Sequence, residues 1–117
     1  MYIRTKDGVY KVSHYNDWAT HKRKGATLID DDKTSYIKNE NIIAQSENLE
    51  LLCDGFYIDE GNEFSFYEEN VYEDFEEAKE VFKKDFDNTS TLYGFIKTSK
   101  GLIYVAKMNS DGKLVLI

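Results

Sequence analysis

The sequence contains no proline and a single cysteine among its 117 residues. Without proline, cis-prolyl turns and slow prolyl isomerisation are excluded. The one cysteine, Cys53, cannot form a disulfide within the chain, which is typical of a reducing compartment. The longest apolar run, Leu102 to Ala106, is far shorter than the roughly 20 residues of a membrane-spanning helix. We therefore expect a cytoplasmic protein without a signal peptide or membrane span.

Recognisable catalytic and ligand-binding motifs are also missing. No GxSxG, Walker A or GxGxxG pattern occurs, and the Asp-Gly and Lys-Gly pairs are typical of turns. His14, His21 and Cys53 lack the close pairing of zinc ligands. The run Asp30–Asp32 lacks the glycine and the distant glutamate of an EF-hand loop. We expect no catalytic residue, metal site or cofactor, and hence a protein that is not an enzyme.

Charge is distributed unevenly along the chain. The stretch from Asp59 to Asp87 contains 12 acidic residues against three lysines, a net charge of −9, whereas the whole protein carries −7. The first 27 residues contain six basic residues against two acidic ones, a net charge of +4. Long-range charge governs encounter rates and non-specific binding. We expect the acidic stretch to attract a basic partner and to repel nucleic acid.

The acidic stretch is also rich in aromatic residues, unlike disordered acidic tails. Tyrosine is favoured at interfaces, because its ring buries a large area while the hydroxyl keeps a hydrogen bond. Tyr67 and Tyr72 stand among the acids and are expected to be exposed at a contact. The chain length suits one hydrophobic core, so we expect a single domain over residues 1–117.

Alternating apolar and polar residues predict two β-hairpins, three further strands and a C-terminal meander. The predicted strands are Tyr2–Thr5, Val9–His14, Ala26–Ile29, Thr34–Ile37, Ile42–Ala44, Phe56–Ile58, Glu63–Tyr67, Leu92–Thr98, Leu102–Met108 and Lys113–Ile117. Asp7-Gly8 predicts a tight turn with positive φ. The run Leu102–Ala106 is apolar at nearly every position, which predicts a central strand covered on both faces. Residues 15–25 are expected to form a basic loop anchored by Trp18.

Two helices are predicted. The capping-box residues Asp74 and Glu77 precede apolar residues at helical spacing, which predicts a helix over Asp74–Asp87. A shorter helix is predicted over Ser46–Cys53, with Gly55 as its left-handed C-terminal residue. The expected architecture is α+β: an antiparallel sheet of about five to seven strands with one short helix and one of about three to four turns packed on it.

Three segments resemble small uncharacterised proteins encoded by phages and prophages of Gram-positive bacteria: Tyr2–Gly8, Leu52–Phe56 and Lys100–Asn109. The resemblance does not extend to residues 15–39 or 62–91. It implies a setting in the cytoplasm of a bacterial host and transfers no functional residue. Small acidic proteins of this kind often look like inhibitors of host enzymes or of anti-phage defence, and some imitate DNA by presenting rows of carboxylates.

The leading hypothesis is a non-enzymatic phage or mobile-element protein that binds, or binds and inhibits, a basic nucleic-acid-handling host or defence protein. Four glutamates of the longer predicted helix recur at spacings of three and four, so they project as one band beside its apolar face. The expected partner-binding residues are Asp59, Glu60, Glu63, Tyr67, Glu68, Glu69, Tyr72, Glu73, Glu76, Glu77 and Glu80. An ordinary solvated helix face explains the same band. Direct nucleic-acid binding and membrane binding are not expected.

Two other functions stay open. The basic loop carries Lys22, Arg23 and Lys24, which would hold phosphates in a small-ligand or nucleotide-signal binding protein or enzyme. A phage structural or assembly component is the third hypothesis, and it predicts stable oligomers. Self-association is compatible with the opposite charges of the two ends of the chain.

Overall fold

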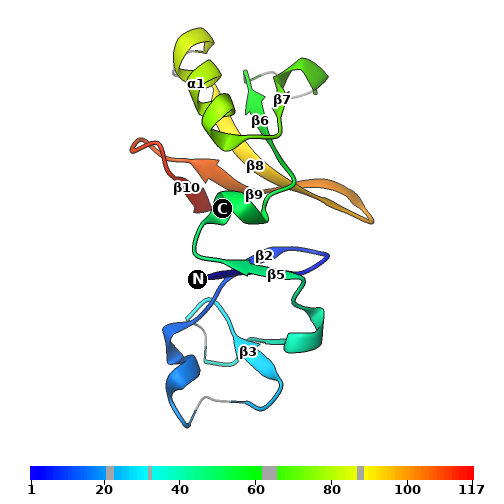
Figure 1. Cartoon of the computed structure of the whole chain (residues 1–117), viewed down its shortest axis with the longest axis vertical. Helices are drawn as coiled ribbons and strands as arrows, with labels where there is room; N and C mark the ends of the chain where they lie inside the picture. Colours follow the sequence, from blue (N-terminus) through cyan, green and yellow to red (C-terminus); the bar gives the residue numbers. More distant parts are fainter. Residues whose placement is uncertain (21–22, 32, 62–65, 87–88) are drawn as a thin grey trace. The chain divides into compact units, whose positions relative to one another are not determined.

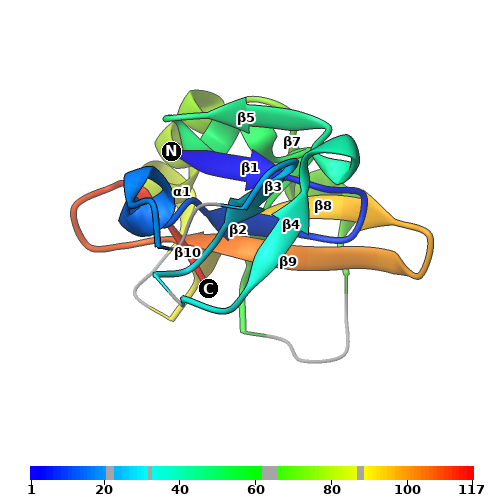
Figure 2. The ribbon, with the colours of Figure 1, turned by 90° about the horizontal axis from the view of Figure 1, so that it is seen from below.

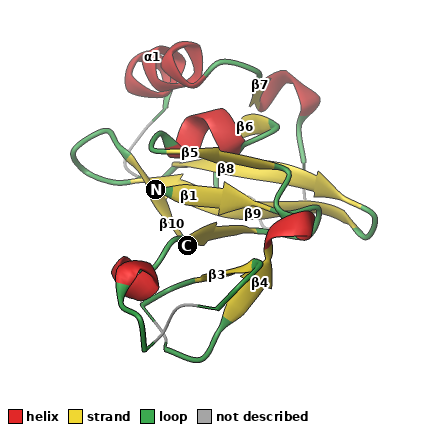
Figure 3. Cartoon of the chain, turned by 60° about the horizontal axis from the view of Figure 1, so that its bottom comes forward, coloured by secondary structure: helices red, strands yellow, loops and turns green. Residues whose placement is uncertain are grey.

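The structure, a computed structural model, describes residues 1–20, 23–31, 33–61, 66–86 and 89–117. Contacts divide the chain into two compact units, Met1–Leu52 and Cys53–Ile117 (Figure 1). The described strands are all antiparallel, and the described residues contain one α-helix besides short 3-10 turns (Figure 3). An α+β fold is therefore confirmed, whereas a single domain over the whole chain stays a prediction. None of the described helices has the length and apolar character needed to cross a membrane.

The N-terminal unit contains two small sheets. A three-stranded sheet has the order β2-β1-β5, and a two-stranded sheet pairs β3 with β4. An isolated bridge between Val12 and Ile29 lies outside these strands. The bounds are β1 (Tyr2–Arg4), β2 (Val9–Lys11), β3 (Ala26–Leu28), β4 (Tyr36–Lys38) and β5 (Ala44–Ser46), with 3-10 turns η1 (His14–Asp17), η2 (Asn39–Asn41) and η3 (Leu49–Leu52).

Both predicted hairpins are confirmed, but the first turn differs from its prediction. β1 pairs with β2 from Tyr2 to Arg4, yet neither Asp7 nor Gly8 has a positive φ. Thr5 closes the loop instead: its N–H donates to the Gly8 carbonyl at 2.9 Å, and its hydroxyl accepts from the Asp7 N–H at 3.2 Å. Among the described non-glycine residues, positive φ angles occur in the acidic turn of the second hairpin, at Asp30 (59°) and Asp31 (53°).

Ile3 and Leu28 are the fully buried side chains of these strands, and a polar side chain fixes the loop between β2 and β3. The Asn16 amide donates to the carbonyls of Ser13 and Leu28 at 2.7 and 2.8 Å and accepts from the Leu28 N–H at 2.8 Å. The prediction that Trp18 anchors this loop is wrong, because Trp18 is 55% exposed. Trp18 packs edge-on against the Tyr15 ring, with 5.1 Å between centroids.

The predicted short helix over Ser46–Cys53 is wrong. Ser46 belongs to β5, and its hydroxyl accepts from the Asn48 N–H, so it caps a local turn rather than an α-helix. Only the 3-10 turn η3 forms, and it buries Leu49 and Leu52. Gly55 has no positive φ and begins the next strand, so it is not a helix C-cap. The predicted strand Ile42–Ala44 overlaps β5 by one residue.

The C-terminal unit contains a five-stranded sheet with the order β10-β9-β8-β6-β7. Its elements are β6 (Gly55–Asp59), η4 (Glu68–Asn70), β7 (Val71–Tyr72), α1 (Phe75–Asp85), β8 (Thr91–Thr98), β9 (Gly101–Met108) and β10 (Leu114–Leu116). The predicted meander is confirmed, and Figure 2 shows β8 and β9 as two long adjacent arrows. Residues 63–65 of the predicted strand Glu63–Tyr67 lie outside the described residues, and Phe66 and Tyr67 belong to no strand.

Helix α1 covers one face of this sheet. Asp74 is the N-cap, and its carboxylate accepts from the Glu77 N–H at 3.1 Å, as the capping box predicts. Phe75 and Ala78 are buried, and the Phe75 and Phe56 ring centroids lie 5.4 Å apart. The helix ends at Asp85, and residue 87 of the predicted helix lies outside the described residues.

The prediction of one sheet with five to seven strands is correct only in part. The described strands form three sheets, of three, five and two strands. Strands β1, β2, β3, β4 and β5 are three residues long and pair with one another. Ile3, Val9 and Leu28 on these strands are buried in the core. Short strands that bury their own apolar side chains need no continuation into a larger sheet.

Two glycines of the central strands of the C-terminal unit leave room for neighbouring side chains. A Cβ at Gly55 would lie 2.5 Å from Cζ of the Phe95 ring, its cross-strand neighbour. A Cβ at Gly94 would lie 2.7 Å from the Cys53 sulfur and 3.6 Å from the Phe56 ring. Neither glycine has a positive φ, so close packing, rather than backbone conformation, requires them.

Gly55→Ala should therefore destabilise the protein by about 1 to 3 kcal/mol, because the methyl group forces the Phe95 ring out of place. Urea unfolding followed by circular dichroism measures this loss. The double variant Gly55→Ala/Phe95→Leu is the control, since a smaller side chain makes room and should give a non-additive recovery. A free energy of unfolding unchanged by Gly55→Ala would contradict the packing argument.

Candidate functional site

The predicted acidic residues are mostly at the surface of the C-terminal unit. The exposed members are Glu60, Glu68, Glu69, Glu73, Glu76, Glu77 and Glu80. Asp59, Tyr67 and Tyr72 are half-buried, and Glu63 lies outside the described residues. The expectation that the two tyrosines are exposed is thus met only in part. We call the seven exposed glutamates the acidic surface.

Two short elements and one helix present six of these carboxylates, and the seventh, Glu60, follows β6. Glu68 and Glu69 stand on η4, directly before β7, while Glu73 lies between β7 and the N-cap of α1. Glu76, Glu77 and Glu80 occupy the first two turns of α1, where negative charge also stabilises the helix dipole. Within the described residues, none of the seven forms a salt bridge. The last turn differs in sign, because Lys83 and Lys84 stand there.

Tyr72 connects the acidic surface to the sheet. Burial raises the pKa of its hydroxyl, and the neighbouring carboxylates of Glu77 and Asp85 raise the pKa further. Tyr67 is held from its backbone, since its N–H donates to the Tyr57 hydroxyl at 3.0 Å.

Sequence reasoning missed a row of aromatic rings in the same unit. Phe66 stacks on Tyr57 at 4.4 Å, Tyr57 lies 6.2 Å from Tyr104, and Tyr104 stacks on Tyr93 at 4.3 Å, with interplanar angles of 14°, 13° and 7°. Cross-strand partners share a face, so the pairs Tyr57–Tyr93 and Phe95–Tyr104 place these tyrosines on one face of the sheet. This is the face opposite Phe56, which packs on α1.

A β-bulge sets the position of Tyr104 in this row. Gly94 pairs with Ala106 but the next residue, Phe95, pairs with Tyr104, so Val105 is an extra residue on β9. If β8 and β9 paired regularly, without this bulge, the Tyr104 side chain would lie on the other face of the sheet. Burial raises the pKa of Tyr104 to about 12, with smaller contributions from Tyr57, Asp59 and Tyr93.

The prediction that Leu102–Ala106 is covered on both faces is wrong for its first half. Val105 and Ala106 are buried, but Leu102, Ile103 and Tyr104 are 38%, 39% and 36% exposed. The reason is the length of β10, which pairs only with Ala106–Met108. The Ile117 N–H adds one bond to the Val105 carbonyl, and no described strand lies beyond that point on this side of β9.

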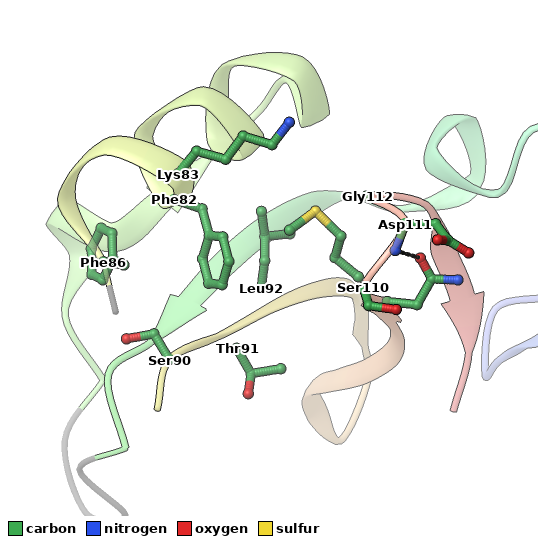
Figure 4. A pocket seen from close by; sticks show the side chains of 11 residues that line it. Phe82, Lys83, Phe86, Ser90, Thr91, Leu92, Ser110, Asp111 and Gly112 are labelled. Atoms are coloured by element: carbon green, nitrogen blue, oxygen red, sulfur yellow. Dashed lines mark hydrogen bonds between the residues drawn. The ribbon is translucent and has the colours of Figure 1, made fainter. Parts of the chain in front are cut away.

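A hollow of about 600 Å³ lies between the C-terminal end of α1 and the β9–β10 turn (Figure 4). Phe82 and Leu92 point toward each other in it, and Phe86, Ser110 and Asp111 line its sides. Its size falls within the range of small-molecule sites. Its lining combines these apolar rings with the polar side chains of Lys83, Ser90 and Thr91.

The N-terminal unit contains a more basic hollow of about 610 Å³, lined by Arg23, Lys24, Gly25, Ala26, Tyr36, Lys38, Asn39 and Glu40. The Arg23 guanidinium lies 4.5 Å above the Tyr36 ring, an arrangement that orients a planar cation. Lys22, which was expected to bind phosphate here, lies outside the described residues.

The other candidate ligands of this unit form a local contact. The Asp31 carboxylate accepts from the His14 N–H at 3.2 Å and lies 2.9 Å from Nδ1 of His14. These bonds hold the pKa of Asp31 below its usual value. Across the described residues, no group of three or more His, Cys, Asp or Glu side chains is arranged to hold a metal ion.

Comparison with known proteins gives no relative, since no protein-family model, curated protein or solved structure matches this chain.

The aromatic row predicts a defined response to alkaline pH. An unfolded tyrosine titrates near 10, so the unfolded chain ionises before folded Tyr104, whose pKa is about 12. The stability contributed by the neutral hydroxyl is intact below pH ~10 and is lost as pH rises toward ~12. Tyr104→Phe should therefore lose less stability than the natural protein between pH ~9 and ~11. Urea unfolding at the two pH values tests this, and equal losses would contradict it.

Proposed function

We propose that this protein is a non-enzymatic binding protein that engages a basic surface of another protein through the acidic surface. The observation that supports this proposal is the presentation of six exposed glutamates by η4, the β7–α1 junction and α1, with a seventh, Glu60, directly after β6. None of the seven has a salt-bridge partner in the described part of the chain. A charge of one sign held on a capped helix is preorganised for a partner of the opposite sign.

The proposed partner is a nucleic-acid-handling protein of a bacterial host or of its defence against phages. Such proteins carry basic grooves that neutralise phosphate charges. Carboxylates spaced along a helix carry the same negative charge as the DNA phosphates and would occupy the same basic groove. The proposed consequence is competition with DNA, in the manner of DNA-mimic or anti-CRISPR inhibitors, within a phage or mobile-element setting.

Neutralising the helix carboxylates tests the proposal. The variant Glu73→Gln/Glu76→Gln/Glu77→Gln/Glu80→Gln keeps side-chain size and helix propensity while removing four charges. Affinity capture from a Gram-positive lysate at about 0.15 M and about 0.5 M salt identifies basic proteins bound by the natural chain. We expect the variant to bind such a protein at least tenfold more weakly, about 1.4 kcal/mol, and to lose competition with DNA.

A matched control removes four exposed carboxylates elsewhere: Asp7→Asn/Asp17→Asn/Glu40→Gln/Asp111→Asn. Both variants change net charge equally, so a difference between them reports position rather than total charge. Equal binding by the natural chain and the four-glutamine variant would overturn the proposal. The four glutamates would then be an ordinary solvated helix face.

A second candidate function is supported by the hollow around Arg23, Lys24 and Lys38 in the N-terminal unit. Three cations beside an aromatic ring suit a phosphate joined to a planar base. In this alternative, the chain is a small-ligand or nucleotide-signal binding protein.

Thermal unfolding against a nucleotide panel tests this alternative. A ligand at a hundred times its dissociation constant should add about 2.7 kcal/mol to the free energy of unfolding. The gain should disappear in Arg23→Ala/Lys38→Ala and persist in Lys11→Ala, which removes an exposed cation outside the hollow. No shift with any nucleotide would exclude this function.

A further inference from the structure

We propose that the open half of β9 is a second binding site, which takes an extended acidic segment of a partner protein as an added β-strand. The site consists of Gly101–Tyr104, on the side of β9 that β10 leaves uncovered. It is independent of the acidic surface, because it uses a different edge of the unit and the opposite sign of charge.

The backbone supplies the first argument. In an antiparallel pair, alternate residues direct N–H and C=O groups away from the partner strand. β8 pairs with β9 over Gly101–Tyr104, so alternate residues of this segment present these groups to the open side. Natural sheets usually protect such an edge, since it can pair with another chain. Here the protection stops at the Ile117–Val105 bond.

The side chains supply the second argument. Leu102, Ile103 and Tyr104 are consecutive and all exposed, so apolar groups flank the open backbone on both faces of the sheet. Tyr104 continues on one face into its stack with Tyr93, which holds its ring in place. Strand addition uses these two components together: main-chain bonds provide affinity, and contacts with alternate side chains provide specificity.

Charge determines which segment fits. The chain from Thr91 to Ile117 carries Lys97, Lys100, Lys107 and Lys113 against Asp111, a net charge of +3. Adding Asp59, whose carboxylate acts on the Tyr104 hydroxyl, and Asp54, whose carboxylate accepts from the Lys97 N–H at 2.7 Å, leaves +1. Lys97 is the cross-strand neighbour of Leu102, and Lys100 and Lys107 lie on either side of the open segment. The complementary segment therefore alternates apolar residues between acidic ends.

Selection from a displayed library of random ten-residue peptides against the full chain tests the proposal. We expect enrichment of peptides that alternate apolar residues and carry Asp or Glu at their ends. Ile103→Lys should weaken their binding at least tenfold, while Leu51→Lys, at an exposed apolar residue of the N-terminal unit, should not. Enrichment of basic peptides, absence of enrichment, or equal binding by Ile103→Lys would overturn the proposal.

Further measurements keep the test decisive if Ile103→Lys folds poorly. Lys100→Glu/Lys107→Glu changes only exposed lysines and should shift preference from acidic to basic peptides. Bound peptide should protect alternate amides of Gly101–Val105 from hydrogen exchange, which contact with the sheet face alone would not do.

A dimer that Ile103→Lys dissociates, seen by light scattering, would assign the edge to a second copy instead. The four-glutamine variant of α1 should bind these peptides normally, which separates this proposal from the proposed function.

Discussion

The C-terminal unit depends on the close approach of β6 and β8 at two glycines. Gly94 leaves room for the Cys53 sulfur and the Phe56 ring on the face that α1 covers, and Gly55 leaves room for the Phe95 ring across the strands. Side chains with a Cβ at either position would push these groups outward. Helix α1 packs on Phe56 on one face of this sheet, and the tyrosine row lies on the other face. Both candidate surfaces of the unit follow from this arrangement.

The two surfaces differ in sign and in chemistry. The acidic surface consists of solvated carboxylates on helical backbone, so any affinity it has depends on ionic strength. The open half of β9 combines unpaired backbone positions with apolar side chains, and burial there depends little on salt. A unit with both can hold a protein at two places, and linkage of two sites raises total affinity without a new contact at either.

The sequence predicted the elements with strong local signals. Asp74 and Glu77 identified the start of α1, and alternation identified the meander and both hairpins. Long-range facts were not predictable in the same way. Helical spacing at Leu49 and Leu52 suits a 3-10 turn as well as a short α-helix. No local sequence pattern around Trp18 indicates whether its side chain is buried or exposed.

The candidate site was predictable to the same limited extent. Acidic side chains are at the surface because burial of a charge is costly, so composition alone indicated their exposure. The aromatic row needed a bulge at Val105, which no local pattern announces. The partial pairing of β10 with β9 depends on the register of the two strands, which no local pattern announces either.

The exposed indole of Trp18 has a practical consequence for how folding of this chain is observed. It is the only tryptophan, and it stands in the N-terminal unit. Intrinsic fluorescence excited at the indole therefore reports on that unit, while the α1 signal in circular dichroism comes from the other. Coincident transitions of the two probes would mark one cooperative folding unit, and separate transitions would mark two.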